Sequence, residues 1–80
     1  MADANLADTD LRRADLSQAV LNKANLQGAN LEDANMVHTR LKEVNLKAAN
    51  LSRADLTKAD LRDTDLENAH LIGANLGLRI

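Results

Sequence analysis

Residues Ala49–Leu66 read ANLSRADLTKADLRDTDL, and one five-residue phrase accounts for the whole stretch. Each phrase contains a small residue, then Asn or Asp, then Leu, then two variable residues. The phrase continues in both directions without a skipped position, so a repeat of this regularity outweighs any local propensity. The central residues of its 15 copies are Leu6, Leu11, Leu16, Leu21, Leu26, Leu31, Met36, Leu41, Leu46, Leu51, Leu56, Leu61, Leu66, Leu71 and Leu76.

The two positions before each centre are as restricted as the centre itself. Ala stands two residues before the centre in 11 copies, and the others have Thr9, Thr39, Val44 and Thr64. The residue directly before the centre is Asn in seven copies and Asp in five. Its exceptions are Val20, Arg40 and His70.

A period of five suits neither regular backbone. On an α-helix five residues turn about 500°, so successive Leu side chains would lie roughly 140° apart and no apolar face would form. On an unbroken strand five is an odd number, so successive Leu side chains would point to opposite faces. Ala and Leu share a face only if the segment that holds them is short and extended. The chain must therefore turn a corner in every repeat, which predicts a β-solenoid with Ala and Leu inside.

The Asn or Asp before each Leu fits a chain rich in corners. Its short side chain can hydrogen-bond to nearby backbone and tolerates the dihedral angles of turns. Ala, Leu, Lys, Glu and Arg favour helices by composition, but propensity is a weak prior and the five-residue register never breaks.

Two consecutive phrases, Ala54-Asp55-Leu56-Thr57-Lys58 and Ala59-Asp60-Leu61-Arg62-Asp63, resemble the pentapeptide-repeat family. The resemblance covers residues 4–78. It implies an all-β, right-handed quadrilateral β-helix with four repeats per coil and just under four coils. Residues 1–80 would form a single domain.

Four repeats per coil would stack each residue over the equivalent residue four repeats later. Asn5, Asn25 and Asn45 would then form a ladder of side-chain amides. Arg13, Asp33 and Arg53 would alternate in sign along another column, and Arg12 would lie over Glu32. Coils of three or of five repeats would also keep the Asp residues apart, so the charge pattern alone does not select four sides.

Composition excludes several kinds of function. The chain contains no Cys, Pro, Phe, Tyr or Trp, so it has no thiolate metal site and no aromatic platform for nucleic-acid bases. Its formal net charge of −2 gives no attraction to nucleic acid or to anionic lipid. The sequence shows neither a signal peptide nor an apolar stretch long enough to cross a membrane, so the cytoplasm is favoured. No cofactor is predicted.

The titratable residues do not gather into a predicted active site. Glu43 and Asp63 would stack at a spacing that resembles a carboxylate pair, but a chain without insertions has no loop to enclose them. His38 and His70 fall on different sides, and no nucleophile motif surrounds Ser17 or Ser52. We therefore expect no catalytic and no metal-binding residues. The exposed aliphatic residues Val37 and Ile72 are interpreted as ordinary surface residues.

The two ends of the solenoid are the expected contact points. Stacked coils have unpaired edges at the top and the bottom, which are templates for another chain. Leu78 and Ile80 could cover the last coil or meet a partner. We expect either an end-to-end homodimer through the terminal coils or a cap supplied by a longer parent chain.

The function that the sequence favours is that of a non-catalytic structural or protein-interaction module, a rigid rod with an unknown protein partner. We expect no contact with a membrane and no direct binding of nucleic acid. The alternative, implied by the resemblance alone, is a DNA-mimicking binder of a topoisomerase such as DNA gyrase. The short length, the mixed charge and the absence of Phe disfavour it.

Overall fold

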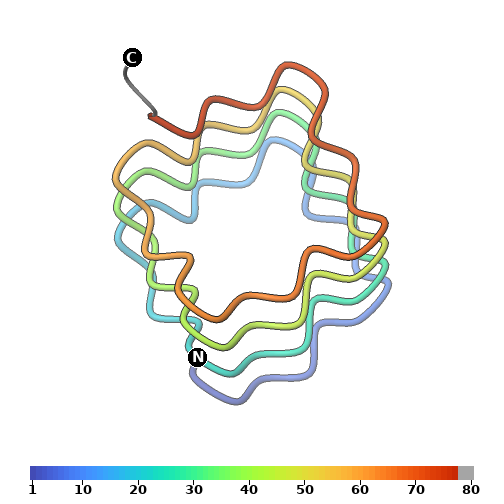
Figure 1. The fold of residues 1–80 in the computed structure, drawn as a ribbon, viewed down its shortest axis with the longest axis vertical. Helices are drawn as coiled ribbons and strands as arrows, with labels where there is room; N and C mark the ends of the chain where they lie inside the picture. The colour runs from blue at the N-terminus through green and yellow to red at the C-terminus, as the bar shows by residue number, and fades with distance from the viewer. Residues whose placement is uncertain (78–80) are drawn as a thin grey trace.

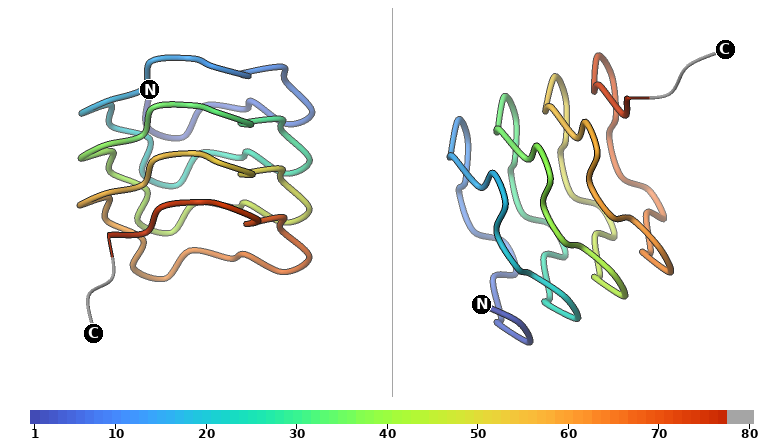
Figure 2. Two further views of the ribbon diagram at one scale, coloured as in Figure 1. Left: turned by 90° about the horizontal axis from the view of Figure 1, so that it is seen from above. Right: turned by 90° about the vertical axis from the view of Figure 1, so that its left-hand side faces the viewer.

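The chain winds around one axis as a stack of coils in the computed structural model, which describes residues 1–77 (Figure 1). In this view the path runs anticlockwise as it comes toward the viewer from the blue N-terminal end, so the solenoid is right-handed. The side views show successive coils lying over one another without a protruding loop (Figure 2). The solenoid that the five-residue period predicted is therefore observed.

A tight turn forms the corner in each repeat. The carbonyl of the central residue accepts a hydrogen bond from the N–H three residues later, as from Ala29 to Leu26 at 3.0 Å. The second variable residue has a positive φ, for example 59° at Arg53 and 60° at Lys58. A positive φ at the third of four residues identifies a type II turn, where Gly is the usual occupant. Charged and bulky residues adopt this conformation along almost the whole chain.

Neighbouring coils are joined by parallel bridges between residues that are four repeats apart, such as Asn5 with Asn25 and Asp55 with Asn75. Each bridge involves a single residue of each coil, because a corner interrupts the extended backbone in every repeat. Within residues 1–77 there is accordingly no helix, and no strand is longer than one bridge residue.

Between residues 25 and 54, a repeat that keeps Asn or Asp satisfies all five of its backbone N–H groups. Three of them donate to the next or previous coil, one closes the turn, and the last donates to the Asn or Asp side chain. Around Leu26 the five bonds are Asn25 N to Ala4 O (2.9 Å), Leu26 N to Asn45 O (2.8 Å), Gly28 N to Lys47 O (2.9 Å), Ala29 N to Leu26 O (3.0 Å) and Gln27 N to Asn25 Oδ1 (3.1 Å). This complete pairing is what buried and stacked backbone requires.

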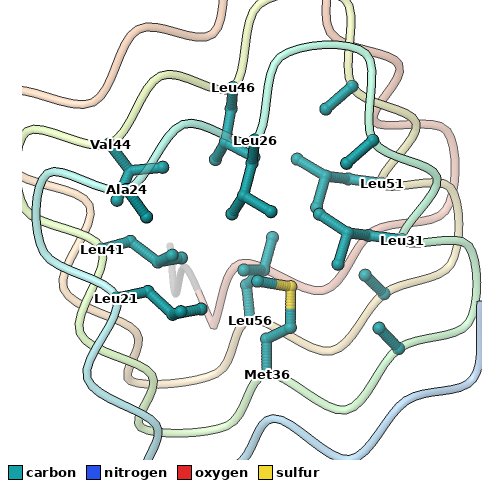
Figure 3. Close-up of a cluster of buried hydrophobic side chains, with 14 residues drawn as sticks. Leu21, Ala24, Leu26, Leu31, Met36, Leu41, Val44, Leu46, Leu51 and Leu56 are labelled. Atoms are coloured by element: carbon teal, nitrogen blue, oxygen red, sulfur yellow. The ribbon is translucent and has the colours of Figure 1, made fainter. Parts of the chain in front are cut away.

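The core consists of side chains that point inward from four directions, two levels of which are drawn in Figure 3. Leu21 lies next to Leu41, and Met36 next to Leu56. The central side chains between residues 21 and 56 have at most 1% of their surface exposed. These residues are Leu21, Leu26, Leu31, Met36, Leu41, Leu46, Leu51 and Leu56. The central residues of the outer coils are only partly buried: Leu6, Leu11, Leu16, Leu61, Leu66, Leu71 and Leu76.

The molecule is broader than it is tall, with extents of 33 × 23 × 18 Å. Figure 1 looks along the shortest of these directions and shows the coils nearly end-on. The expectation of a rod is therefore wrong in its proportions. Few coils make a low block whose end faces are large relative to its sides.

The repeat also begins one copy earlier than the sequence pattern indicated. The Met1 carbonyl accepts a hydrogen bond from Ala4 N–H at 3.1 Å, and Asp3 has the positive φ of a corner at 63°. Met1 thus occupies the central position of a further turn, although its side chain is 69% exposed.

Candidate interaction surfaces

The N-terminal end face contains apolar side chains that a further coil would cover in the middle of the stack. Leu6, Leu11 and Leu16 pack against the core on one side and remain partly exposed on the other. Leu66, Leu71 and Leu76 do the same at the C-terminal end face. Leu78 and Ile80, the predicted contact residues, lie outside the described residues.

Backbone groups at both end faces lack partners within residues 1–77. The N–H groups of Asn5, Asp10 and Asp15 donate to nothing, whereas the equivalent Asn25 N–H donates to the preceding coil at 2.9 Å. At the opposite face the N–H groups of Leu66 and Leu71 are unpaired in the same way. Within residues 1–77, both ends of the stack therefore have the unpaired groups of a ladder edge.

On the sides, the Asn and Asp residues cap the turns and do not bond to one another. Asn5 Oδ1 accepts from Ala7 N–H at 3.2 Å, and Asn25 Oδ1 accepts from Gln27 N–H at 3.1 Å. No side-chain hydrogen bond links Asn5, Asn25 and Asn45 in the described structure. The predicted amide ladder is therefore wrong, because a nearby backbone N–H takes the side-chain oxygen first.

The exceptions to the Asn or Asp rule leave backbone donors unused. Val20 and Arg40 cannot cap, and the N–H groups of Asn22 and Lys42 have no acceptor within residues 1–77. Because Val20 and Arg40 form a bridge with each other, these two donors lie at adjacent levels of one side. Asn22 Oδ1 is also buried without a partner. Sequence reasoning noted both exceptions but did not connect them with free amides.

A surface hollow lies over the same column. It has a volume of ≈ 540 Å³ and is lined by Gln18, Val20, His38, Thr39, Arg40, Lys58 and Asp60. We call it the Arg40 groove. Its lining combines corner residues with the column Val20, Arg40 and Asp60, whose members are bridged level by level.

The one carboxylate of the Arg40 groove is already paired. Arg62 donates to Asp60 through Nε at 2.9 Å and through Nη2 at 2.7 Å. These hydrogen bonds, together with one from the Arg62 backbone N–H, lower the pKa of Asp60 to about 2. Asp60 is therefore ionised at neutral pH, with its charge balanced by Arg62.

A second, mixed-charge hollow lies between Asp10, Arg12, Arg13 and Glu32, with a volume of ≈ 340 Å³. Arg12 bonds to Asp10 of its own repeat at 2.8 Å, and it lines the same hollow as Glu32 of the next coil. Bonding to Arg12 lowers the pKa of Asp10 to about 2.

Arg13, Asp33 and Arg53 lie four repeats apart, the interval at which the coils are bridged, so their charges alternate in sign along one column as predicted. Arg53 donates to Asp33 at 3.0 Å and forms an ion pair with Glu32 at 2.9 Å. Arg13, at the other end of the same column, forms no ion pair within residues 1–77. Alternating charges one coil apart therefore pair at one level and not at the next.

The structure brings the remaining candidate residues into no common site. His38 lines the Arg40 groove, whereas His70 bridges to Asn50 on a different side. Glu43 lies 3.9 Å from Lys23, and the Ser17 hydroxyl donates to Asp15 at 2.7 Å. Ser52 is only 9% exposed.

The inward-facing Thr residues bond to the chain itself. The Thr39 hydroxyl donates to the Leu16 carbonyl at 2.9 Å, and the Thr64 hydroxyl to the Leu41 carbonyl at 2.8 Å. These hydroxyls are thus part of the wall of the solenoid.

The described part of the chain contains no helix with the length and apolar character needed to cross a membrane. This finding matches the absence of a long apolar stretch in the sequence.

Known proteins share the repeat and the fold of this chain. A family model described as pentapeptide repeats matches residues 1–36 and 39–77. HetL, a pentapeptide repeat protein involved in heterocyst differentiation regulation from the cyanobacterium Nostoc sp. strain PCC 7120, superposes with a TM-score of 0.90 at 38% identity over 94% of this chain. A pentapeptide repeat protein from the thylakoid lumen of Arabidopsis thaliana superposes with a TM-score of 0.90 at 32% identity over 91% of this chain. No curated protein sequence matches the chain.

The relatives are longer than this chain. The matched region spans 35% of HetL and 50% of the Arabidopsis protein. A third, Rfr23 from the cyanobacterium Cyanothece 51142, matches over 58% of its own length and 94% of this chain, with a TM-score of 0.57 and 31% identity. From the family match over nearly all residues and from the two close superpositions, we conclude that the chain belongs to the pentapeptide-repeat family and has its right-handed β-helical fold.

Proposed function

We propose that this chain is a non-catalytic protein-interaction module that associates end to end through its terminal coils. Bridges between residues four repeats apart support an arrangement of four repeats per coil, and with it just under four coils. The observation that carries the proposal is that, within residues 1–77, each end face combines partly exposed Leu side chains with unpaired ladder groups. Both kinds of surface are stabilised by covering them with another coil.

The hydrogen-bonding groups of the two end faces complement each other. Inside the stack, the N–H of a central Leu donates to the carbonyl of the Asn or Asp that precedes the stacked Leu of the next coil, as from Leu26 to Asn45 at 2.8 Å. The N–H groups of Leu66 and Leu71, unpaired within residues 1–77, have the donor position of this bond at the C-terminal end face. The carbonyls of Asn5 and Asp10 have its acceptor position at the N-terminal end face. A head-to-tail contact between two copies would therefore continue both the ladder and the Leu columns. Such a contact does not close, so it permits assemblies larger than a dimer.

A non-catalytic role agrees with the state of the surface carboxylates. General acid catalysis near neutral pH needs a carboxyl group whose pKa is raised toward the working pH. The carboxylates of both hollows are shifted the other way, with the pKa of Asp10 and of Asp60 lowered to about 2 by their Arg partners. HetL is described as involved in regulation, and a regulatory interaction would suit this chain equally well.

DNA mimicry finds less support. It needs a continuous acidic surface along the axis, and the Arg40 groove contains two unpaired cationic side chains, Arg40 and Lys58, within the described residues. A gyrase supercoiling assay that showed inhibition or protection at about stoichiometric protein would restore this alternative.

Sedimentation velocity over a range of concentrations tests end-to-end association. We expect the weight-average mass to rise with concentration, and Leu71→Lys to shift the chain toward the monomer by placing a charge on the C-terminal end face. Ile72→Lys is the matched control, because it adds the same charge one residue away on a side chain that is 79% exposed on the side of the block. A wild-type chain that stays monomeric up to about 1 mM, or equal effects of the two variants, would refute end-to-end association. Circular dichroism of both variants confirms that they retain the fold.

A further inference from the structure

The Arg40 groove lies where two adjacent levels of the stack have Val20 and Arg40 in place of the capping Asn or Asp. In the repeats that keep Asn or Asp, its side-chain oxygen accepts from the N–H two residues later, as Asp60 does from Arg62 at 3.2 Å. At Val20 and Arg40 this acceptor is absent at two adjacent levels. The N–H groups of Asn22 and Lys42 therefore face the position where a side-chain oxygen lies in the other repeats. Stacked coils place these two donors roughly 4.8 Å apart.

The same surface gathers cations without carboxylate partners. Within residues 1–77, Arg40, Lys42 and Lys58 form no ion pair, whereas Lys23, Lys47 and Arg53 each pair with an acidic residue at 3.9 Å or less. Arg62 is occupied by Asp60, so the four cations and one carboxylate of this surface carry a net charge of +3 on a chain whose total is −2. Arg13 is the other described Arg or Lys without an ion pair, and it lines the second hollow.

The groove also has an apolar element. Val20 lines it with 41% of its surface exposed, next to the buried Thr39. An occupant of the groove thus meets guanidinium and ammonium groups and one aliphatic side chain. The two unused backbone donors, on Asn22 and Lys42, lie two residues after the groove residues Val20 and Arg40. Each of these polar groups is a donor, so the occupant must supply acceptors, preferably with negative charge.

We infer that the Arg40 groove is a docking site for an extended acidic segment of a partner protein. Its carboxylates would pair with Arg40, Lys42 and Lys58, and its carbonyl or carboxylate oxygens would accept from the Asn22 and Lys42 amides. Single-stranded nucleic acid fits less well, because the chain has no aromatic residue on which bases could stack. The inference rests on the proposed role as an interaction module and names the partner's chemistry for a face that the end contacts do not use.

Nuclear magnetic resonance titration of the 15N-labelled chain with hexaglutamate tests the inference directly. At low salt we expect the largest shifts at the backbone amides of Asn22 and Lys42. Because exposed ion pairs are weak, affinity should fall several-fold when NaCl rises from about 20 to about 200 mM. Hexalysine should produce no comparable shifts at these amides.

Arg40→Asn is the decisive variant, because it restores the capping residue while it removes the cation. We expect hexaglutamate to bind at least about fivefold more weakly, while the thermal midpoint rises because Lys42 N–H gains an acceptor. A loss of binding in a more stable protein cannot be attributed to unfolding. Arg13→Asn is the matched control, since it removes the unpaired Arg of the second hollow, and it should leave the affinity within about twofold.

Three results would overturn the inference. The first is the absence of shifts at Asn22 and Lys42 with hexaglutamate, or equal losses in the Arg40 and Arg13 variants. The second is tighter, Arg40-dependent binding of hexathymidylate, which would assign the groove to nucleic acid. The third is a shift of these amides with protein concentration alone, which would assign it to a second copy. None of these results depends on the sedimentation experiment, so failure of the groove and failure of end-to-end association are distinguishable.

Discussion

At the residue scale, the chain depends on a backbone conformation that most of its residues do not favour. Within residues 1–77, the second variable residue of each repeat has a φ between 57° and 63° wherever it is not Gly, for example at Lys23, Glu43 and Ala48. For an L-residue the left-handed region costs about 1–2 kcal/mol relative to the right-handed one. The fold tolerates this because the turn bond and the ladder bond of each corner are formed only in that conformation.

Ala48→Gly should therefore raise or preserve the free energy of unfolding, by zero to about 1 kcal/mol. Glycine removes the strain of the φ of 58° at Ala48, and this gain offsets its greater freedom in the unfolded chain. Ala7 is the first variable residue of its own repeat, where φ is negative. Ala7→Gly should lower the free energy of unfolding by about 0.5–1 kcal/mol. Urea denaturation of the two variants gives the comparison, and equal losses would contradict the corner geometry.

At the scale of the coil, position along the stack decides how much a Leu contributes. Leu41 is fully buried between two neighbouring levels, whereas Leu71 packs against the core on one side only. The apolar area that each removes from water differs accordingly, and so does the cavity that its truncation would leave.

Leu41→Ala should lower the free energy of unfolding by about 2–5 kcal/mol, because the levels above and below prevent collapse of the cavity. Leu71→Ala should cost clearly less, and Lys47→Ala should stay within about 0.5 kcal/mol. Guanidinium denaturation monitored by circular dichroism measures all three. A similar loss for Leu41 and Lys47 would mean that the assignment of inside and outside positions is wrong.

The sequence predicts the coil well because one rule repeats at every level. A period of five excludes helix and continuous strand, and the pairing of Ala with Leu identifies the inside. What the sequence leaves open depends on competition between bonds of similar strength. Asn25 could bond to Asn45 or to Gln27 N–H, and only the geometry of the corner shows that the backbone wins. The unused donors beside the Arg40 groove escape prediction for the same reason, since they belong to Asn22 and Lys42 and not to the unusual residues Val20 and Arg40.

At the scale of the whole molecule, the ladder should open from its ends. Terminal coils have a neighbour on one side, and their central Leu residues are only partly buried. Solenoids unfold in this way because each level is stabilised by its contacts with the adjacent levels.

Amide hydrogen exchange should follow that order. Asn25 N–H, which donates to Ala4 at 2.9 Å, should exchange more slowly than Asn5 N–H, which has no acceptor within residues 1–77. The slowest amides should belong to the ladder between Leu21 and Leu56. Uniform protection from Asn5 to Asn75 would show that the end faces are covered in solution, and a dilution series would tell whether a second copy covers them.

The four-repeat interval between bridged partners has a consequence for how such a chain can change in length. Deleting one pentapeptide would leave every later repeat with an intact corner, but it would move each of them to the adjacent side of the block. If the deleted repeat lay between Val20 and Arg40, Arg40 would face a new neighbour in the preceding coil, and the Arg40 groove would be dismantled. Deleting four consecutive pentapeptides would shorten the block by one level and keep every remaining side chain above its former kind of neighbour. The backbone of this fold therefore tolerates the deletion of single repeats, whereas the arrangement of its surface side chains is kept only when whole coils are deleted.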